Sequence, residues 1–345
     1  MDILFIYLSR FLLSELYGVN PQIILLIIFS LLFYNFVINP INFLKIANNH
    51  IQYFFAISLL LVISLFNIDI DSILNILILF TLPFIKWKSY KYSKFFTYFI
   101  LMSTIIYCII ILKDFSVYAN RSHNYLLLGR GILVSQAIIL FTNFQESKYY
   151  KLAISLLFLI ALSIMHGRLN AIVSILLVIL YLIKNFKYSW ILLVSMVFSL
   201  SLLLNLISTL NIGTIKRLLN DQQSISDRIG LVQTGLEELQ DITTLLFGGG
   251  KDYSNTIAFE KINYPYFHNL PIELLLDFGI FAIPILIIWS LMLIKSGKII
   301  FLEKEILLPV LLIVESFQFF KSFEFNQSAS LFLIITLFNN KEYEV

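Results

Sequence analysis

The segment YFHNLPIELLLDFG at positions 266–279 holds polar side chains that could transfer a proton or bind an anion. Asn269 is a good helix N-cap, and Pro271 suits the first turn of the helix that would follow. The unpaired amide groups at such a helix end attract an anion. His268 stands immediately before this end, where a neutral imidazole could act as a general base. The alternative is a histidine that only caps the helix at a membrane interface.

Two acidic residues, Glu273 and Asp277, follow on one face of the predicted helix, one turn apart. Asp277 would lie roughly 12 Å along it, at about 1.5 Å of rise per residue. Acids inside a membrane are costly and usually face a partner or a polar cavity. Arginines are the available partners, and Glu315, in a later apolar segment, is a third acid of this kind. Asp277 and Glu315 could equally have a purely structural role.

Arginine is the second candidate group, because its planar guanidinium binds phosphate oxygens with two hydrogen bonds and keeps its proton. Arg168 occurs in MHGRLN and Arg228 in SDRIG. Arg130, in LLLGRGILV, lies roughly 7–8 Å inside its apolar segment and is flanked by two glycines that leave space around it. A charge at this depth needs a partner or water. Arg130 would either extend outward to the interface or line a polar cavity.

Three consecutive glycines at 248–250 allow backbone conformations that other residues avoid. A lysine follows them, but the GxxxxGK[ST] pattern of a phosphate-binding loop is missing, so we interpret the run as a hinge toward the membrane. The surrounding polar interval contains no HExxH, DxD or similar metal-ligand spacing, and the single cysteine, Cys108, lies in an apolar run. The sequence therefore predicts a site with no metal and no cofactor, where arginine neutralises the charge.

The chain that must position these residues is strongly apolar. It has 345 residues, of which 59% are hydrophobic and 13% charged, and its mean hydropathy is +0.89. Apolar runs of roughly 15–20 residues recur throughout, which is typical of a multi-pass membrane protein. The few basic residues are spread along the chain, which argues against nucleic-acid binding. Because backbone groups in lipid must bond internally, we expect an all-α, polytopic membrane helix bundle.

We predict one membrane domain over 1–345, with spans within 3–207 and 269–339 and one large outer loop at 208–268. The first segment, 3–17, contains Arg10 and Glu15 and could instead lie along the interface, which leaves eleven or twelve spans. The twelve candidate segments are 3–17, 22–38, 51–66, 72–85, 95–112, 125–142, 152–166, 170–183, 189–207, 269–294, 305–320 and 328–339.

The outer loop should contain short helices. SDRIGLVQTGLEELQDI, at 226–242, has apolar residues at spacings of three and four. Ser226 or Asp227 would cap this helix, and Arg228 would then fall in its first turn.

Lysines predict the orientation, because cytoplasmic loops carry the excess of positive charge. The strongest cluster is KWKSYKYSK at 86–94, and alternate loops hold further lysines, including Lys295 and Lys298. Both termini would be cytoplasmic, and the 208–268 loop would face outward from a bacterial cytoplasmic membrane. Every basic residue in the predicted cytoplasmic loops is lysine, whereas five of the six arginines lie on the outer side or in the outer half of the membrane.

These motifs resemble the O-antigen ligase and O-antigen polymerase (Wzy-type) superfamily of bacterial membrane glycosyltransferases. The ligase motif of His, then Asn, Ser or Gln, nine residues and Gly is matched by His268, Asn269 and Gly279, and Asp277 matches the acid two residues before that glycine. The family's second glycine, three residues later, is Ala282 here. Further similarities, which together cover about 166–290, are Ser226-Asp227-Arg228, the glycine-rich stretch 246–250, and Arg168, which follows Gly167 where the family usually has Ser.

The resemblance implies that a glycan carried on undecaprenyl diphosphate is transferred to a sugar hydroxyl at the outer leaflet. It implies that His268 is the catalytic base. The remaining roles it implies are pyrophosphate binding by Arg228, Arg168 and Arg130, and support of the local geometry by Asn269, Glu273, Asp277 and Gly279.

Two members of this superfamily fit. A polymerase extends a lipid-linked repeat unit, whereas a ligase moves the finished chain to lipid A core. We favour the polymerase, because polymerases are the more divergent group and this sequence departs at several motif positions. The expected partners are undecaprenyl-diphosphate-linked oligosaccharides, the lipid bilayer, and a chain-length regulator and flippase of the same O-antigen or capsule pathway. A flippase would not need the long outer loop, and a sensor or scaffold would tolerate alanine at His268.

Overall fold

In the computed structural model, all elements of the described residues are helices and none is a strand, which confirms the all-α class. The predicted segments 3–17, 22–38 and 189–207 lie outside the described residues. The described residues are 45–46, 48–66, 73, 76–77, 79–80, 82–84, 94–113, 125–141, 147–165, 168–186, 223–250, 253–264, 267, 269–303, 306–320, 331–332 and 334–336.

The apolar segments predicted from the sequence fold as helices with nearly the predicted ends, because such runs satisfy their backbone groups internally. The short 3-10 helix η1 (Leu82–Phe84) falls in the predicted segment 72–85. The longer helices are α4 (Ile51–Phe66), α6 (Lys94–Lys113), α8 (Tyr125–Phe141), α9 (Lys148–Ile164), α10 (Arg168–Asn185) and α18 (Leu307–Phe319).

The predicted span 269–294 is a longer, broken helix. It consists of α16 (Leu270–Phe278), the 3-10 turn η3 (Gly279–Ala282) and α17 (Ile283–Leu302). Gly279 breaks it with a φ of 59°, and Pro284 in the first turn of α17 has no amide hydrogen to continue the α-helical pattern. Because α17 continues to Leu302, Lys295 and Lys298 lie inside a helix, and their predicted placement in a loop was wrong.

One helical stretch of the described residues, Leu270–Leu302, is long and apolar enough to cross a membrane. The apolar parts of five other helices reach only 10–17 residues, so the count of twelve spans stays a prediction. Along the outward face of this stretch, exposed apolar side chains recur every three or four residues, at Ile280, Ile283, Ile287, Leu291 and Ile294. A continuous apolar stripe on an exposed helix face is typical of contact with lipid or with another protein.

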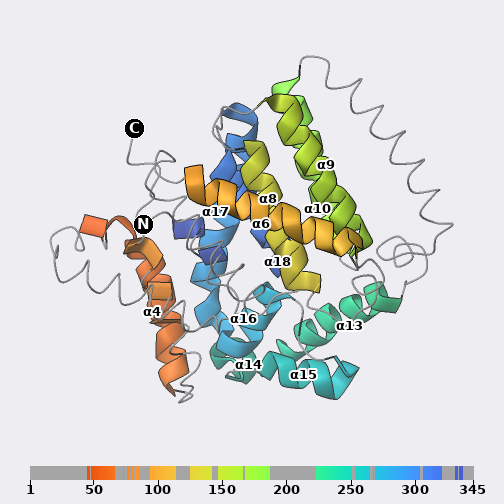
Figure 1. Ribbon diagram of the computed structural model, residues 1–345. Helices are drawn as coiled ribbons and strands as arrows, with labels where there is room; N and C mark the ends of the chain where they lie inside the picture. Colours follow the sequence, from red (N-terminus) through yellow and green to blue (C-terminus); the bar gives the residue numbers. More distant parts are fainter. Residues whose placement is uncertain are drawn as a thin grey trace.

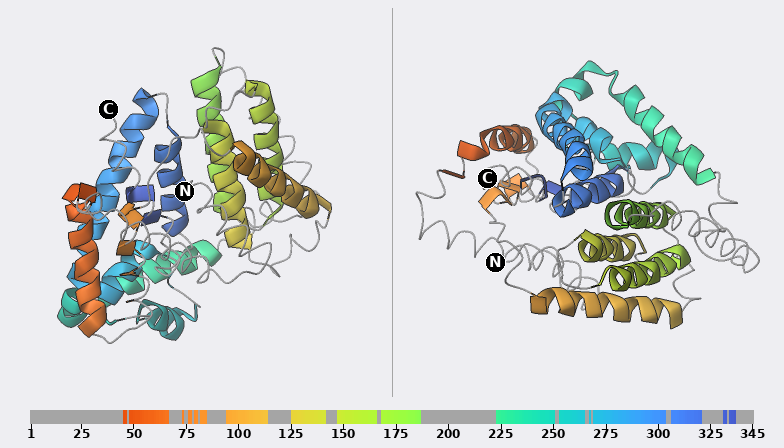
Figure 2. Two further views of the ribbon diagram at one scale, coloured as in Figure 1. Left: turned by 60° about the vertical axis from the view of Figure 1, so that its left-hand side comes forward. Right: turned by 90° about the horizontal axis from the view of Figure 1, so that it is seen from above.

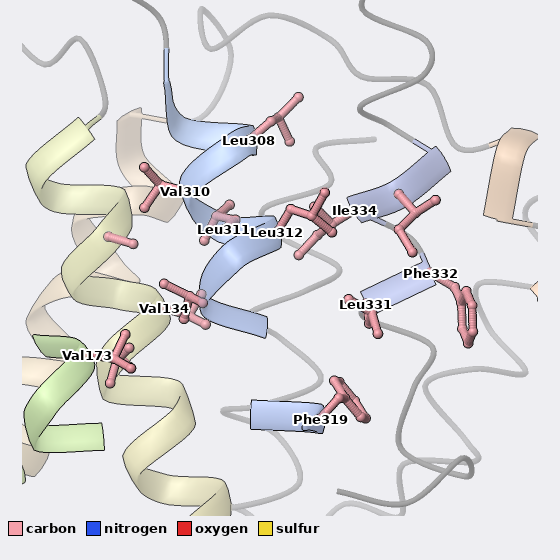
Figure 3. Close-up of a cluster of buried hydrophobic side chains, with 14 of the residues drawn as sticks. Val134, Val173, Leu308, Val310, Leu311, Leu312, Phe319, Leu331, Phe332 and Ile334 are labelled. Atoms are coloured by element: carbon pink, nitrogen blue, oxygen red, sulfur yellow. The ribbon is translucent and has the colours of Figure 1, made fainter. Parts of the chain in front are cut away.

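Helices α8, α9, α10, α17 and α18 form a bundle, with α6 lying across α8 and α9 (Figures 1 and 2). Helix α4 packs against α17 and η3. The core lies around α18, where its side chains meet those of α8 and α10 and a short helical segment near the C-terminus (Figure 3). The labelled members are Val134, Val173, Leu308, Val310, Leu311, Leu312, Phe319, Leu331, Phe332 and Ile334.

Two lysines bring together helix ends that the sequence assigned to the cytoplasmic side. The Lys148 ammonium donates to the Asn185 carbonyl at 2.9 Å, at the end of α10. The Lys184 ammonium donates to the Glu303 carbonyl at 2.8 Å, just past the end of α17. Cations are favourable at helix C-termini, where carbonyl groups lack helical partners. The two hydrogen bonds place these helix ends at one end of the bundle. The alternation of the loops and the orientation in the membrane stay predictions.

Candidate functional site

Three helices from the predicted outer loop pack together on α16. They are α13 (Gln223–Glu238), α14 (Ile242–Phe247) and α15 (Tyr253–Ile262), and we call them the outer cap. The cap has a small core of its own, formed by the buried residues Leu231, Ala258, Phe267 and Leu276. Since Leu276 belongs to α16, the cap is joined directly to the start of the candidate span. Figure 1 shows the cap at the end of the bundle where α8 begins.

The start of α13 differs from the prediction. The described part of the helix starts at Gln223, so Ser226 and Asp227 lie inside the helix instead of capping it, and Arg228 lies beyond the first turn. Nothing between 223 and 225 breaks a helix, and the chain therefore continues helical upstream of the polar pair. Arg228 is half-buried in this position. The predicted single helix 226–242 is divided, because Asp241 caps a new helix, α14, by accepting from the Thr244 amide at 3.0 Å.

The glycine run crosses the end of α16 in direct backbone contact. The Gly249 amide donates to the Leu276 carbonyl at 2.8 Å, and the Gly250 amide donates to the Asp277 carbonyl at 3.2 Å. Gly248 has a φ of 71° and Gly279 a φ of 59°, a region that favours glycine. A Cβ atom on Gly279 would lie 2.7 Å from the Gly248 nitrogen. These two glycines therefore permit a crossing that side chains would block.

Asp277 connects this crossing to the next helix. Its carboxylate accepts a hydrogen bond from the Ser254 amide at 2.9 Å, in the first turn of α15. A carboxylate at a helix N-terminus satisfies an unpaired amide and is favoured by the helix dipole. Because its carbonyl also accepts from Gly250, Asp277 holds both the glycine run and α15 against α16. This gives the residue a structural role of its own.

Asn269 caps α16, as predicted. Its side chain accepts from the Ile272 amide at 3.2 Å, and Pro271 lies in the first turn. Glu273, also in the first turn, is buried. His268 lies outside the described residues. Of its two neighbours, Asn269 forms this cap, and the Phe267 amide donates to the Asn255 side chain of α15 at 3.2 Å.

The electrostatics of the outer cap keep two carboxylates charged at neutral pH. A hydrogen bond from Lys261 lowers the pKa of Glu238, whose carboxylate also accepts from the Tyr253 hydroxyl at 2.9 Å. The Thr244 amide lowers the pKa of Asp241. Glu238 links α13 to α15, whereas Asp241 fixes the start of α14. The two groups therefore contribute to the fold of the cap above acidic pH and stop contributing as they gain protons.

Arg130 is paired inside the bundle. Its Nε donates to Glu315 Oε1 at 3.0 Å and its Nη2 to Glu315 Oε2, and both side chains are almost fully buried. The guanidinium also lies over the Phe319 ring, 4.8 Å from its centre. The pairing meets the expectation that an acid in an apolar segment faces an arginine, and the guanidinium is buried in the bundle instead of reaching the interface. The role of Arg130 in pyrophosphate binding stays a prediction.

A second polar contact lies beside this ion pair, and the sequence did not reveal it. The Gln318 side chain donates to Asn170 at 2.7 Å, which connects α18 to the first turn of α10. The available signal was the spacing of Glu315 and Gln318, which puts two polar groups on one face of an apolar helix. Arg168 is the first residue of α10, but its side chain lies outside the described residues.

No protein-family model matches this chain, and no curated protein matches it either. The structure brings the stretch 246–250 together with 269–279 in one unit. It separately joins Arg130 to Glu315 where α8 begins and α18 ends.

Proposed function

We propose that this protein is a polysaccharide repeat-unit polymerase acting at the outer leaflet of a bacterial cytoplasmic membrane. In this reaction the bond between the anomeric carbon of the growing glycan and the diphosphate oxygen breaks. A new bond forms from that carbon to the non-reducing-end sugar hydroxyl of a lipid-linked repeat unit. The hydroxyl proton passes to His268, and undecaprenyl diphosphate leaves.

One observation carries the proposal: the two motif stretches that lie far apart in the sequence are in backbone contact. Gly249 and Gly250 bond to the carbonyl groups of Leu276 and Asp277, on the helix that Asn269 caps. Helix α13, which bears Arg228, also packs against α16, so the glycine run, α13 and α16 belong to one unit. A reaction needing both an anion site and a base next to it requires such a unit.

Arg228, Arg168 and the amide groups at the start of α16 are the proposed contacts to the pyrophosphate. Positive charge and oriented amide groups stabilise the negative charge that develops on the leaving group. Arg130 is the least favoured of the three arginines as a pyrophosphate contact, because its guanidinium already binds Glu315 with two hydrogen bonds. The local geometry of the site would be maintained by Asn269, Glu273, Asp277 and Gly279.

The experiment replaces His268 by alanine in the native strain and resolves the surface polysaccharide on a gel. We expect long chains to vanish while a single repeat unit still reaches its acceptor, because only chain extension needs the base. Arg228→Ala should give the same pattern. Arg217→Ala, in the same loop but outside the motifs, is the matched control and should leave the chain lengths unchanged.

Three other outcomes would overturn the proposal, provided that membrane expression is normal. Loss of every repeat unit from the acceptor would favour a ligase or a flippase. An unchanged ladder in His268→Ala would remove this residue from catalysis. Shortened chains in Arg217→Ala as well would indicate a general defect of the loop.

A further inference from the structure

Helix α14 presents apolar side chains to the outside of the outer cap. Ile242 is 70% exposed, Phe247 55%, Leu245 38% and Leu246 37%. The helix contains no charged residue, and Thr244 is its buried member. Four exposed apolar side chains in six residues form a concentrated patch for so small a surface.

This patch continues the exposed apolar face of the candidate span. Helix α14 packs against η3 and α16, and the Leu246 carbonyl carbon would lie 2.7 Å from a Cβ on Gly279. Ile280 follows directly and is the first residue of the exposed stripe that runs down α17. If the stripe faces lipid, the adjoining patch on α14 borders the same lipid.

The length of the span puts α14 at the membrane boundary. A hydrocarbon core of about 30 Å takes roughly 20 helical residues. Lys295 is the first charged residue of α17 and would mark the inner end of the hydrocarbon core. Roughly 20 residues before it, the helix reaches the outer end of the core near position 275. The glycine run contacts Leu276 and Asp277, and α14 ends directly before that run. Helix α14 therefore stands at the outer edge of the hydrocarbon core.

We propose that α14 is an interfacial anchor whose partner is the bilayer itself: Ile242, Leu245, Leu246 and Phe247 contact the lipid acyl chains at the outer boundary. An interfacial amphipathic helix binds a membrane by burying its apolar face at the boundary between the head groups and the acyl chains. Asp241, the N-cap of α14, and Glu237 on α13 lie exposed before it and would form the polar edge. The anchor would hold the cap against the membrane, and it does not depend on glycosyl transfer.

Spin labels read in lipid vesicles test this proposal. In a Cys108→Ala background, which removes the one native cysteine, single cysteines replace Ile242 or Phe247. Glu237→Cys and Glu260→Cys, at exposed polar positions of α13 and α15, are the matched controls. The labelled full-length protein is reconstituted in phosphatidylglycerol and phosphatidylethanolamine vesicles, and collisions with oxygen and with a water-soluble nickel chelate are measured.

We expect the ratio of oxygen to nickel accessibility to exceed one at positions 242 and 247 and to fall below one at 237 and 260, because oxygen concentrates in lipid. Nickel accessibility at 242 and 247 equal to that of the controls would show a water-facing helix and overturn the proposal. Protection of these labels from both reagents would show that another protein surface, such as a second copy of this chain, covers the helix, and would overturn the proposal as well. Each variant should elute from size-exclusion chromatography in detergent at the same volume as the parent protein, which verifies that it is folded.

Discussion

Alanine at Gly279 is expected to detach the outer cap from α16 and to destabilise the protein by about 2–6 kcal/mol. A non-glycine residue at a φ of 59° and a ψ of −144°, a backbone region that side chains rarely adopt, costs roughly 1–3 kcal/mol. The added Cβ would also lie 2.7 Å from the Gly248 nitrogen and the Leu246 carbonyl, which overpacks the crossing by roughly 1–3 kcal/mol more. These neighbours are backbone atoms, so no side chain can move aside. Gly248→Ala should have a similar effect.

Gly297→Ala is the matched control, because Gly297 lies within α17 with nothing within 4 Å of an added Cβ. Alanine is the better helix former by about 1 kcal/mol, so this variant should be neutral or slightly more stable. Thermal unfolding in detergent and proteolysis at Lys261, on the cap, provide the two readouts. Equal melting temperatures and equal cleavage rates for Gly279→Ala and Gly297→Ala would show that the crossing does not hold the cap.

Removal of either member of the Arg130–Glu315 pair should destabilise the bundle by about 3–5 kcal/mol. Each single alanine variant leaves a buried charge with its main partner missing, and that is the costly step. Replacement of both residues by methionine removes both charges and keeps the volume approximately constant. The double variant should therefore regain much of the stability that each single variant loses, as measured by unfolding in detergent.

The same double variant separates two roles of Arg130. If it is folded and still makes polymer, Arg130 serves the structure alone. If it is folded and inactive, Arg130 joins the residues that bind pyrophosphate. A single Glu315→Ala variant with unchanged thermal stability would contradict the buried ion pair itself.

Local patterns in the sequence predicted the helices well, because each apolar run carries its own boundary signals. Helix α4 has the predicted ends, and Asn269 caps α16 as its residue type suggested. The break after α16 was missed, because Gly279 was interpreted as a motif residue and its effect on the helix was not considered. The start of α13 was also missed, since two polar residues that can cap a helix equally occur inside its first turns.

Contacts between distant parts of the chain could not be predicted from local patterns. Arg130 and Glu315 were both recognised as charges in apolar segments, but they lie 185 positions apart and nothing in either segment identifies the other as its partner. Likewise, glycines at 248–250 indicated an unusual backbone, while their docking on Leu276 and Asp277 depends on how the whole cap folds. The sequence therefore identified the candidate residues, whereas their assembly into a cap on α16 required the structure.

The most direct test of the proposed activity is a reconstitution with one substrate. Purified protein in lipid vesicles receives lipid-linked repeat units extracted from the native strain, and both glycan length and free undecaprenyl diphosphate are measured. A polymerase uses this substrate both as donor and as acceptor, so we expect lipid-linked oligomers to form. One undecaprenyl diphosphate should be released for each glycosidic bond formed. The His268→Ala variant should produce neither oligomers nor free undecaprenyl diphosphate. Folded protein that yields no oligomers from these units, or oligomers that form equally with His268→Ala, would contradict the account.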